Sequence, residues 1–223
     1  MKSVLVIGMG RFGINLATEL KKLGNQVMVV DQHEEKIDKI SPDFPDCHIG
    51  DCTNENVLKS LDVKSFDLCF VTIGTNFESS LVITILLKKL GAKRIIAKAS
   101  QDIQASILKN IGADEVIYPE RDIAQGLAVK FSASNVFDYI ELSDEYGIFE
   151  IPVNPQWIGL TIIQADVRKK HKLNIIAVKN GENMSVSPPA DYVFRENDHI
   201  IVVGKPDNVT KLTDKKSKKN DPA

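Results

Sequence analysis

No apolar run in the sequence is long enough to cross a membrane as a helix. The longest run, Leu81 to Leu87, is far below the roughly 20 residues that such a helix needs. The first residues, Met1 to Ser3, lead directly into a strand-like segment, without the apolar stretch and small-residue cleavage site of a secretory signal. We therefore expect the 223-residue chain to stay in the cytoplasm.

Cysteine is scarce and the net charge is small. The three cysteines, Cys47, Cys52 and Cys69, are odd in number and lack C-x-x-C spacing, so we expect reduced thiols rather than a disulfide framework or a zinc site. A net charge of −2 provides no electrostatic footprint for nucleic acid or anionic lipid. Neither is an expected direct partner.

The sequence also lacks a recognisable catalytic constellation. Its four histidines are scattered along the chain, and it contains no nucleophile elbow, P-loop lysine, zinc motif or kinase signature. A dehydrogenase would need a proton-transfer group beside a substrate pocket, and no such arrangement is visible. We therefore expect no enzymatic activity.

A glycine motif stands near the N-terminus, in the segment VLVIGMGRFG from Val4 to Gly13. The segment Ser3 to Ile7 is typical of a strand buried on both faces, and the apolar spacing from Phe12 to Leu23 predicts a helix. The next predicted strand, Gln26 to Asp31, ends in an acid eighteen residues after Gly13. This order matches the dinucleotide-binding fingerprint of the Rossmann fold.

Each position of the motif has a physical role in such a site. Gly8 makes the tight turn, Gly10 lets the backbone approach a pyrophosphate, and Gly13 lets helix and strand pack closely. Asp31 accepts hydrogen bonds from ribose hydroxyls and repels a 2′-phosphate, which favours NAD(H) over NADP(H). The alternative is a glycine turn of packing value alone, with Asp31 as a solvated strand end.

Strands and helices continue to alternate, which predicts an α/β doubly wound parallel sheet. Polar groups follow two strands, in GDCTN (Gly50 to Asn54) and TIGTN (Thr72 to Asn76), at the edge where such sheets bind ligands. Asp51 or its neighbours would meet an adenine; alternatively, Asp51 and Asn76 are helix N-caps. The further strands are expected at Cys47–Gly50, Asp67–Ile73, Arg94–Lys98 and Glu115–Tyr118, and helices at 54–61, 76–90 and 102–111.

The second half has a different pattern. Turn-forming residues at 132–135 place the boundary of the first domain at residue 134. A small α+β domain is expected over 135–213, with a disordered lysine-rich tail at 214–223. Its predicted strands are Phe137–Leu142, Gly147–Val153, Asn174–Lys179 and His199–Val203, and its one predicted helix is Ile162–His171.

Five segments together resemble a known family. They are VIGMGRFG at 6–13, VVD at 29–31, GDCTNENVL at 50–58, IGADEVIYPERD at 111–122 and LSDEYGIFEIPV at 142–153. These are similar to the RCK proteins, also called KTN, which regulate the conductance of potassium, and above all to the cytosolic KtrA type. The resemblance covers residues 2 to about 212.

The resemblance implies a regulatory nucleotide, ATP, ADP or NAD(H), in the N-terminal domain. Arg11 would reach a terminal phosphate, Lys98 would approach phosphate, and Glu120 would help hold Mg²⁺ or another cation at a dimer interface. The alternatives are a solvated arginine, an exposed strand-end lysine and a helix-start acid. The full set of expected nucleotide-site residues is Gly8, Gly10, Arg11, Phe12, Gly13, Asp31, Asp51, Cys52, Ile73, Gly74, Asn76, Lys98 and Glu120.

The resemblance also implies a second ligand, cyclic di-AMP, at a two-fold interface of the C-terminal domain. Ile162 and Ile163 would line an apolar slot for the adenines, and Arg168 would meet a phosphate. Asp166 would orient Arg168, while Asn174 and Ile175 would border the purine edge. The alternative is that the isoleucines are core residues and Arg168 belongs to a solvated basic face.

By the same resemblance, the chain forms dimers that close into an octameric ring beneath a membrane-embedded potassium channel subunit of the KtrB or TrkH kind. It would lie on the inner face of the membrane through that partner. Two alternatives remain open. One is an NAD-dependent oxidoreductase, and the other is the RCK portion of another cation channel or exchanger, made as a separate chain.

Overall fold

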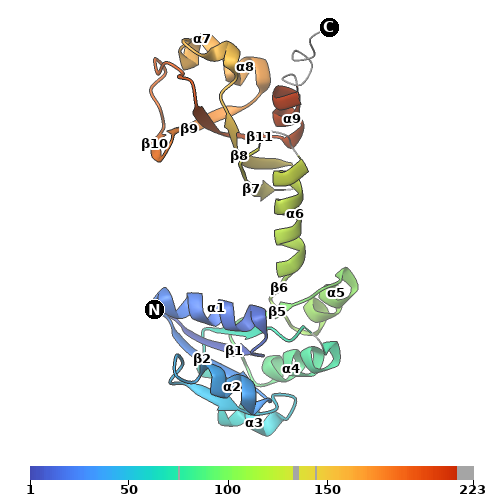
Figure 1. Ribbon diagram of the computed structural model, residues 1–223. Coiled ribbons are helices and arrows are strands. Elements are labelled where there is room, and N and C mark those ends of the chain that lie inside the picture. Colours follow the sequence, from blue (N-terminus) through green and yellow to red (C-terminus); the bar gives the residue numbers. More distant parts are fainter. Residues whose placement is uncertain (75, 133–135, 144, 215–223) are drawn as a thin grey trace. The chain divides into compact units, whose positions relative to one another are not determined.

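The computed structural model describes residues 1–74, 76–132, 136–143 and 145–214 (Figure 1). The chain divides into two compact units, Met1–Arg121 and Asp122–Ala223. The predicted boundary at residue 134 falls outside the described residues and stays a prediction. Of the predicted tail, 214–223, Asp214 is the last residue of the final helix, and residues 215–223 fall outside the described residues. In the part of the chain that the structure covers, no helix is long and apolar enough to span a membrane.

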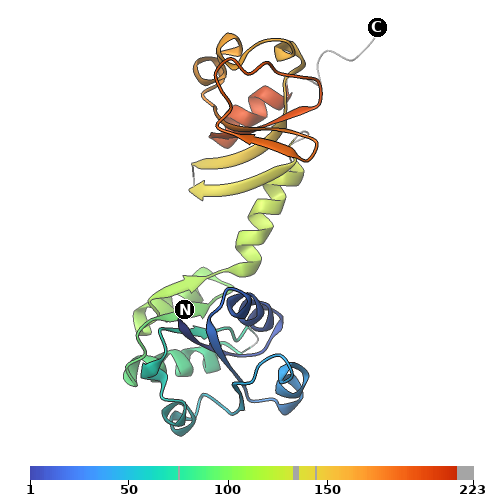
Figure 2. The ribbon, with the colours of Figure 1, turned by 90° about the vertical axis from the view of Figure 1, so that its left-hand side faces the viewer.

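The first unit is a six-stranded parallel sheet with the strand order β3-β2-β1-β4-β5-β6, flanked by helices (Figures 1 and 2). This confirms the predicted doubly wound fold. The strands are β1 (Ser3–Ile7), β2 (Gln26–Asp31), β3 (Cys47–Ile49), β4 (Leu68–Val71), β5 (Ile95–Lys98) and β6 (Glu115–Ile117). The helices are α1 (Arg11–Lys22), α2 (Glu34–Ile40), α3 (Glu55–Ser60), η1 (Val63–Ser65), α4 (Phe77–Lys89), α5 (Asp102–Ile111) and α6 (Pro119–Ser132), which continues into the second unit.

Alternation along β1 explains why the sheet is covered on both faces. Val4 and Val6 pack into a core with residues of α1 and α2, whereas Leu5 and Ile7 pack into a separate core with residues of α3, α4 and α5. All four side chains are buried, as expected for a central parallel strand. The sequence missed α2 because this helix has seven residues and buries only Ile37 and Ile40.

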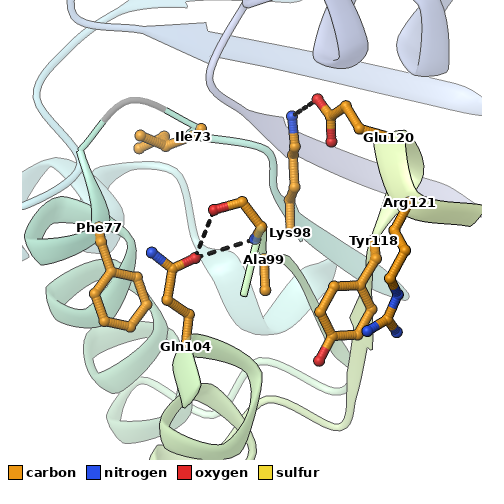
Figure 3. Close-up of a pocket in the computed structure, with 10 residues that line it drawn as sticks. Ile73, Phe77, Lys98, Ala99, Gln104, Tyr118, Glu120 and Arg121 are labelled. Atoms are coloured by element: carbon orange, nitrogen blue, oxygen red, sulfur yellow. Dashed lines mark hydrogen bonds and ion pairs between the residues drawn. The ribbon is translucent and has the colours of Figure 1, made fainter. Parts of the chain in front are cut away.

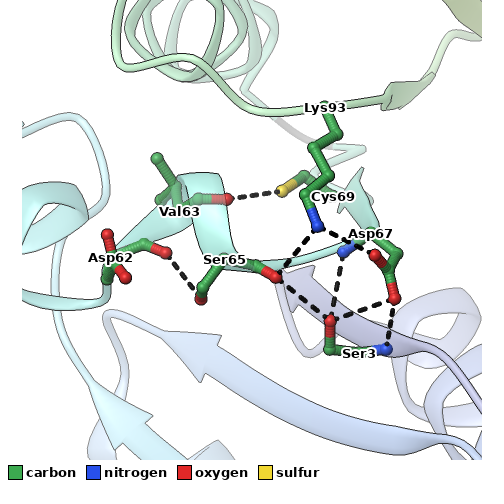
Figure 4. A network of polar contacts seen from close by, with 7 residues as sticks. All are labelled: Ser3, Asp62, Val63, Ser65, Asp67, Cys69 and Lys93. Carbon is green, nitrogen blue, oxygen red and sulfur yellow. Dashed lines mark hydrogen bonds and ion pairs between the residues drawn. The ribbon is translucent and has the colours of Figure 1, made fainter.

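The amino edge of this sheet is closed by a polar network (Figure 4). Asp67 accepts hydrogen bonds from the backbone N–H of Ser3 at 3.0 Å and from the Lys93 ammonium at 2.9 Å. The Ser3 hydroxyl in turn lies 3.3 Å from the carbonyl oxygen of Ser65. These bonds join the starts of β1 and β4 to the turn before β5.

The second unit contains an antiparallel sheet with the strand order β10-β9-β11-β8-β7. Residues of this sheet contribute to a hydrophobic core that is separate from the cores of the first unit. The predicted helix 162–171 is wrong in one respect: it is two short helices, broken at Asp166, which has a left-handed backbone with φ of 48°. The sequence also missed β10 and α9. The elements are β7 (Asp138–Ser143), β8 (Tyr146–Pro152), η2 (Pro155–Trp157), α7 (Ile162–Ala165), α8 (Val167–His171), β9 (Asn174–Asn180), β10 (Asn183–Val186), β11 (Asp198–Gly204) and α9 (Pro206–Asp214).

Candidate functional site

A cleft of about 540 Å³ lies at the carboxyl edge of the parallel sheet. It opens beside β1 and β4, where the strand order reverses and the following helices cover opposite faces, which is where α/β sheets bind ligands. Every residue predicted for the nucleotide site lines this cleft except Gly13, which lies beneath the glycine turn. The lining also includes Thr53 and Thr72, which belong to the predicted segments GDCTN and TIGTN but not to the predicted set of site residues. Further lining residues outside that set are Gln32, His33, Lys36 and Ser79.

The three glycines of the motif meet different surroundings. Gly8 has a backbone φ of +103°, which residues other than glycine rarely adopt. A Cβ on Gly13 would lie 2.1 Å from the Gly8 carbonyl oxygen and 2.7 Å from the Thr72 hydroxyl, so only glycine fits there. A Cβ on Gly10 would meet no atom within 4 Å. Among the described residues, Gly10 is therefore not required by packing, and there is open space over the loop at this position.

The start of α1 suits an anion. Gly10 is its N-cap and provides no side-chain acceptor, and the first turn contains no acidic residue. Helix N-terminal N–H groups and the helix dipole favour negative charge at this position. Arg11, an exposed residue of this turn, lines the same cleft.

Asp31, at the end of β2, is only 6% exposed. Its carboxylate accepts hydrogen bonds from the backbone N–H groups of Met9 at 2.7 Å and His33 at 2.9 Å, and from the Lys36 ammonium at 3.0 Å. Burial acts to raise the pKa of Asp31, but the hydrogen bonds from His33, Lys36 and Met9 outweigh it and hold the pKa below its usual value. Asp31 is thus ionised and also shapes the glycine loop.

Lys98 and Glu120 approach each other at the β5 end of the cleft and form an ion pair (Figure 3). The Lys98 ammonium also lies 5.7 Å from the centroid of the Phe12 ring. The hydrogen bond from Lys98 lowers the pKa of Glu120. A second hollow of about 180 Å³ adjoins this pair and is bordered by Phe77, Tyr118 and Gln104 among others.

In the described part of the chain, no group of three or more His, Cys, Asp or Glu side chains is arranged so that it could hold a metal ion. Glu120 faces Lys98 instead. A cation at Glu120 would therefore need further ligands from elsewhere, and this site stays a prediction.

The two candidate cap residues differ. Asn76 does cap α4, because its side chain accepts a hydrogen bond from the Ser79 N–H at 3.1 Å. Asp51 is not the cap of α3, because Asn54 has that role. The Asp51 carboxylate instead accepts a hydrogen bond from the Thr53 N–H at 2.9 Å.

Burial, and then the charges of Asp51 and Asp31, raise the pKa of the Cys52 thiol to about 12. Cys52 therefore lines the cleft as a neutral group.

The residues predicted for the second ligand lie on α7, α8 and the start of β9. Ile163 is 67% exposed, and Arg168 and Asn174 are also exposed. Ile162 and Ile175 are partly buried and pack against the core, as the alternative of core residues expects, and their part in a second ligand site stays a prediction. The predicted orientation of Arg168 by Asp166 stays a prediction.

Comparisons with known proteins bear on both units. The TrkA-N domain family matches residues 4–119 and the TrkA-C domain family matches residues 147–217. The chain is 39% identical to the Ktr system potassium uptake protein C of Bacillus subtilis, over 95% of this chain and 96% of that one. It is 36% identical to the Ktr system potassium uptake protein A of the same organism, over 91% of both chains.

Solved structures share the fold. A GsuK channel structure covers 95% of this chain and 39% of its own, with a TM-score of 0.65 and 20% identity. Another, of the GsuK channel bound to NAD, covers 96% of this chain and 38% of its own, with a TM-score of 0.53 and 22% identity.

Proposed function

The chain belongs to the family of proteins that join a TrkA-N domain to a TrkA-C domain, and from this premise we propose that it is a regulatory subunit of a potassium transport system. Its N-terminal unit binds ATP, ADP or NAD(H) as a regulatory ligand and performs no chemistry on it. The similarity to the Ktr proteins A and C over nearly the whole of both chains supports the regulatory part of this proposal.

The open space over Gly10 is the observation that carries nucleotide binding. A glycine that packs against nothing, at an uncapped helix start, beside an ionised strand-end acid, is explained by close approach of a phosphate group to the backbone. Arg11 and Lys98 line the same cleft and supply cationic groups for the phosphates.

An NAD-dependent oxidoreductase is the competing function. His33 lines the cleft, but its ring Nδ1 lies 2.8 Å from Asp31 at the end of β2. In Rossmann folds this end holds the adenosine ribose rather than the group that exchanges hydride. His33 is therefore poorly placed for proton transfer to a substrate, which favours the regulatory function.

Regulation would work by population shift. ATP and ADP must bind two conformations of the assembly with different affinity, and a hundredfold difference corresponds to about 2.7 kcal/mol of bias. Arg11 is the group that distinguishes them, because the γ-phosphate brings charge that ADP lacks.

Self-association is supported by an apolar stripe on α6. Ile123, Leu127 and Phe131 recur at helical spacing and are 65%, 48% and 79% exposed. A second copy of the chain covers this stripe in the proposed dimer, and dimers assemble into an octameric ring.

Analytical ultracentrifugation tests the role of the stripe. Leu127→Lys should lower the mass of the assembly relative to the wild type, whereas Gln125→Lys, an exposed neighbour on the same helix, should leave the mass unchanged.

The partner in the membrane is a potassium channel subunit, so the proposed location is the cytoplasmic face of the membrane. Co-expression with such a subunit, followed by detergent purification, should recover a stable complex. A Mg²⁺ or similar cation at Glu120 belongs to the proposed dimer interface, where the copies would bring two such carboxylates together.

The second unit is proposed to bind cyclic di-AMP. Support comes from exposed Ile163, Arg168 and Asn174, which offer an apolar surface, a phosphate-binding cation and a polar edge. Full-length Arg168→Ala should lose this ligand in calorimetry, whereas Lys169→Ala, an exposed basic neighbour on α8, should retain it. Retained binding by Arg168→Ala would remove Arg168 from the site.

Calorimetric titration of the full chain with ATP, ADP, NADH and NADPH tests the nucleotide function. We expect ATP or ADP to bind, and NADH to bind more tightly than NADPH. Gly10→Ala should weaken binding at least about tenfold by obstructing the phosphate. Gly126→Ala is the matched control, because a Cβ there also meets no atom within 4 Å. Failure of the folded wild-type protein to bind any of the four would contradict the proposal.

A further inference from the structure

The Asp31 carboxylate has its acceptor positions occupied by donors of its own chain. Oδ2 accepts from the Met9 N–H at 2.7 Å and from the Lys36 ammonium at 3.0 Å. Oδ1 accepts from the His33 N–H at 2.9 Å and lies 2.8 Å from the ring Nδ1 of His33. A carboxylate offers about four lone-pair sites. A ribose hydroxyl can therefore bond Asp31 only by replacing one of these donors.

The replaceable donors are the side chains, and they stand on the solvent side. The two N–H groups belong to the backbone, at Met9 in the glycine loop and at His33 just after β2. By contrast, the Lys36 and His33 side chains are 41% and 56% exposed, while the Asp31 side chain is only 5% exposed. Both exposed side chains line the cleft. An adenosine ribose that approaches Asp31 thus meets the side chains of Lys36 and His33 first, and of these two Lys36 is the ammonium donor that a 2′-phosphate would attract.

We propose that Lys36 determines how the cleft discriminates between adenine nucleotides with a free ribose 2′-hydroxyl and those with a 2′-phosphate. The inference rests on the proposed nucleotide function. A 2′-hydroxyl competes with the Lys36 ammonium for Asp31, whereas a 2′-phosphate takes the ammonium as its counter-ion. Lys36 accordingly offsets the repulsion between Asp31 and a 2′-phosphate, and the preference for NADH over NADPH is smaller than Asp31 alone would give.

Two pairs of nucleotides isolate this local effect. ADP and adenosine 2′-phosphate 5′-diphosphate differ by a phosphate at the 2′ position, and ADP and ATP differ by a phosphate at the other end of the molecule. Titrations use the full chain as wild type, Lys36→Met, Lys36→Arg and Lys39→Met. Lys39 is an exposed lysine of the same helix and is the matched control for loss of one charge.

We expect Lys36→Met to weaken the 2′-phosphate compound relative to ADP by about tenfold, the effect of losing one charge-assisted hydrogen bond. Lys36→Arg should restore the wild-type ratio, and Lys39→Met should not change it. The ratio of the affinities for ATP and ADP should be the same in the wild type and in Lys36→Met.

Three results would overturn the inference. In the first, the affinity for the 2′-phosphate compound relative to ADP is unchanged in Lys36→Met while circular dichroism shows an intact fold. Lys36 would then form its ion pair with Asp31 without affecting the choice of nucleotide. An equal change in the ATP to ADP ratio would mean a general effect of charge. Absence of any nucleotide binding by the wild type would overturn the proposed function and this inference together, whereas the first two results leave nucleotide binding standing.

Discussion

Each edge of the parallel sheet contains an aspartate that accepts a hydrogen bond from a backbone N–H group of a neighbouring element. The aspartate at the carboxyl edge, Asp31, lines the cleft of about 540 Å³, whereas Asp67 at the amino edge is not among the residues that line it. At the amino edge, Asp67 accepts from Ser3 N–H at 3.0 Å, and at the carboxyl edge, Asp31 accepts from Met9 N–H at 2.7 Å. The pKa of both carboxyls lies below its usual value.

The difference lies in what surrounds each acid. At Asp67 the nearby donors, Ser3 and Lys93, complete a network among residues of the chain itself. At Asp31 the neighbouring loop contains Gly10, over which there is open space. A lowered pKa reports hydrogen bonding and charge at either edge, so it does not by itself identify a binding site. The open space over Gly10, beside Asp31, is the feature on which the proposed binding site depends.

The largest expected effect is that of Gly13→Ala, compared with Gly10→Ala in the same loop. The new Cβ at Gly13 would lie 2.1 Å from a backbone oxygen, and overpacking of this kind should destabilise the first unit by about 3 kcal/mol. Gly10→Ala should change stability by less than about 0.5 kcal/mol. Hydrogen exchange of β1 amides is the measurement, because Trp157, the only tryptophan in the chain, lies in the second unit. Equal stabilities would mean that the loop relaxes around Gly13.

Asp31→Asn should affect both folding and binding, whereas Asp67→Asn should affect folding alone. Replacing the buried carboxylate removes a charged acceptor from Met9, His33 and Lys36, and about 1–3 kcal/mol of stability should be lost. ADP affinity should fall in Asp31→Asn and stay at the wild-type value in Asp67→Asn, both measured by calorimetry. A loss of affinity in Asp67→Asn would contradict the separation of the two edges.

Arg11→Ala should narrow the difference in affinity between ATP and ADP by about tenfold, because one charge-assisted contact to the γ-phosphate is lost. Stability should change little, since Arg11 is exposed. Lys22→Ala, at the other end of α1, is the control. If the ATP to ADP ratio is unchanged, Arg11 does not contact the terminal phosphate.

The smallest expected effect is the acid sensitivity contributed by Asp67. Hydrogen bonds from Ser3 and then Lys93 lower its pKa from 3.8 to about 2. Its contribution to stability is therefore present above about pH 4 and is lost as the pH falls toward 2. Asp67→Asn should flatten the decline in stability of the first unit across this range. An unchanged slope, followed by hydrogen exchange of β1 amides, would assign acid sensitivity to other carboxyls.

Local pattern was enough to predict most of the first unit. Apolar runs bounded by glycine identified β1 and β2. The residues predicted for the nucleotide site, from local pattern and from the family resemblance together, line one cleft with the exception of Gly13, because parallel strands end at the same edge. Helix α2 was not predicted, since its two buried isoleucines form too short a pattern. The break at Asp166 was also missed, because a left-handed residue between two helical turns leaves no periodic trace.

The sequence by itself determined the family, the doubly wound sheet and the glycine loop, since these depend on residue type and spacing along the chain. The tertiary structure alone decided which groups donate hydrogen bonds to the Asp31 carboxylate. It also decided that Lys98 faces Glu120 and that Asn54 rather than Asp51 caps α3. Hydrogen bonds depend on distances of about 3 Å between atoms of different elements. Spacing along the chain does not fix such distances, and folding does.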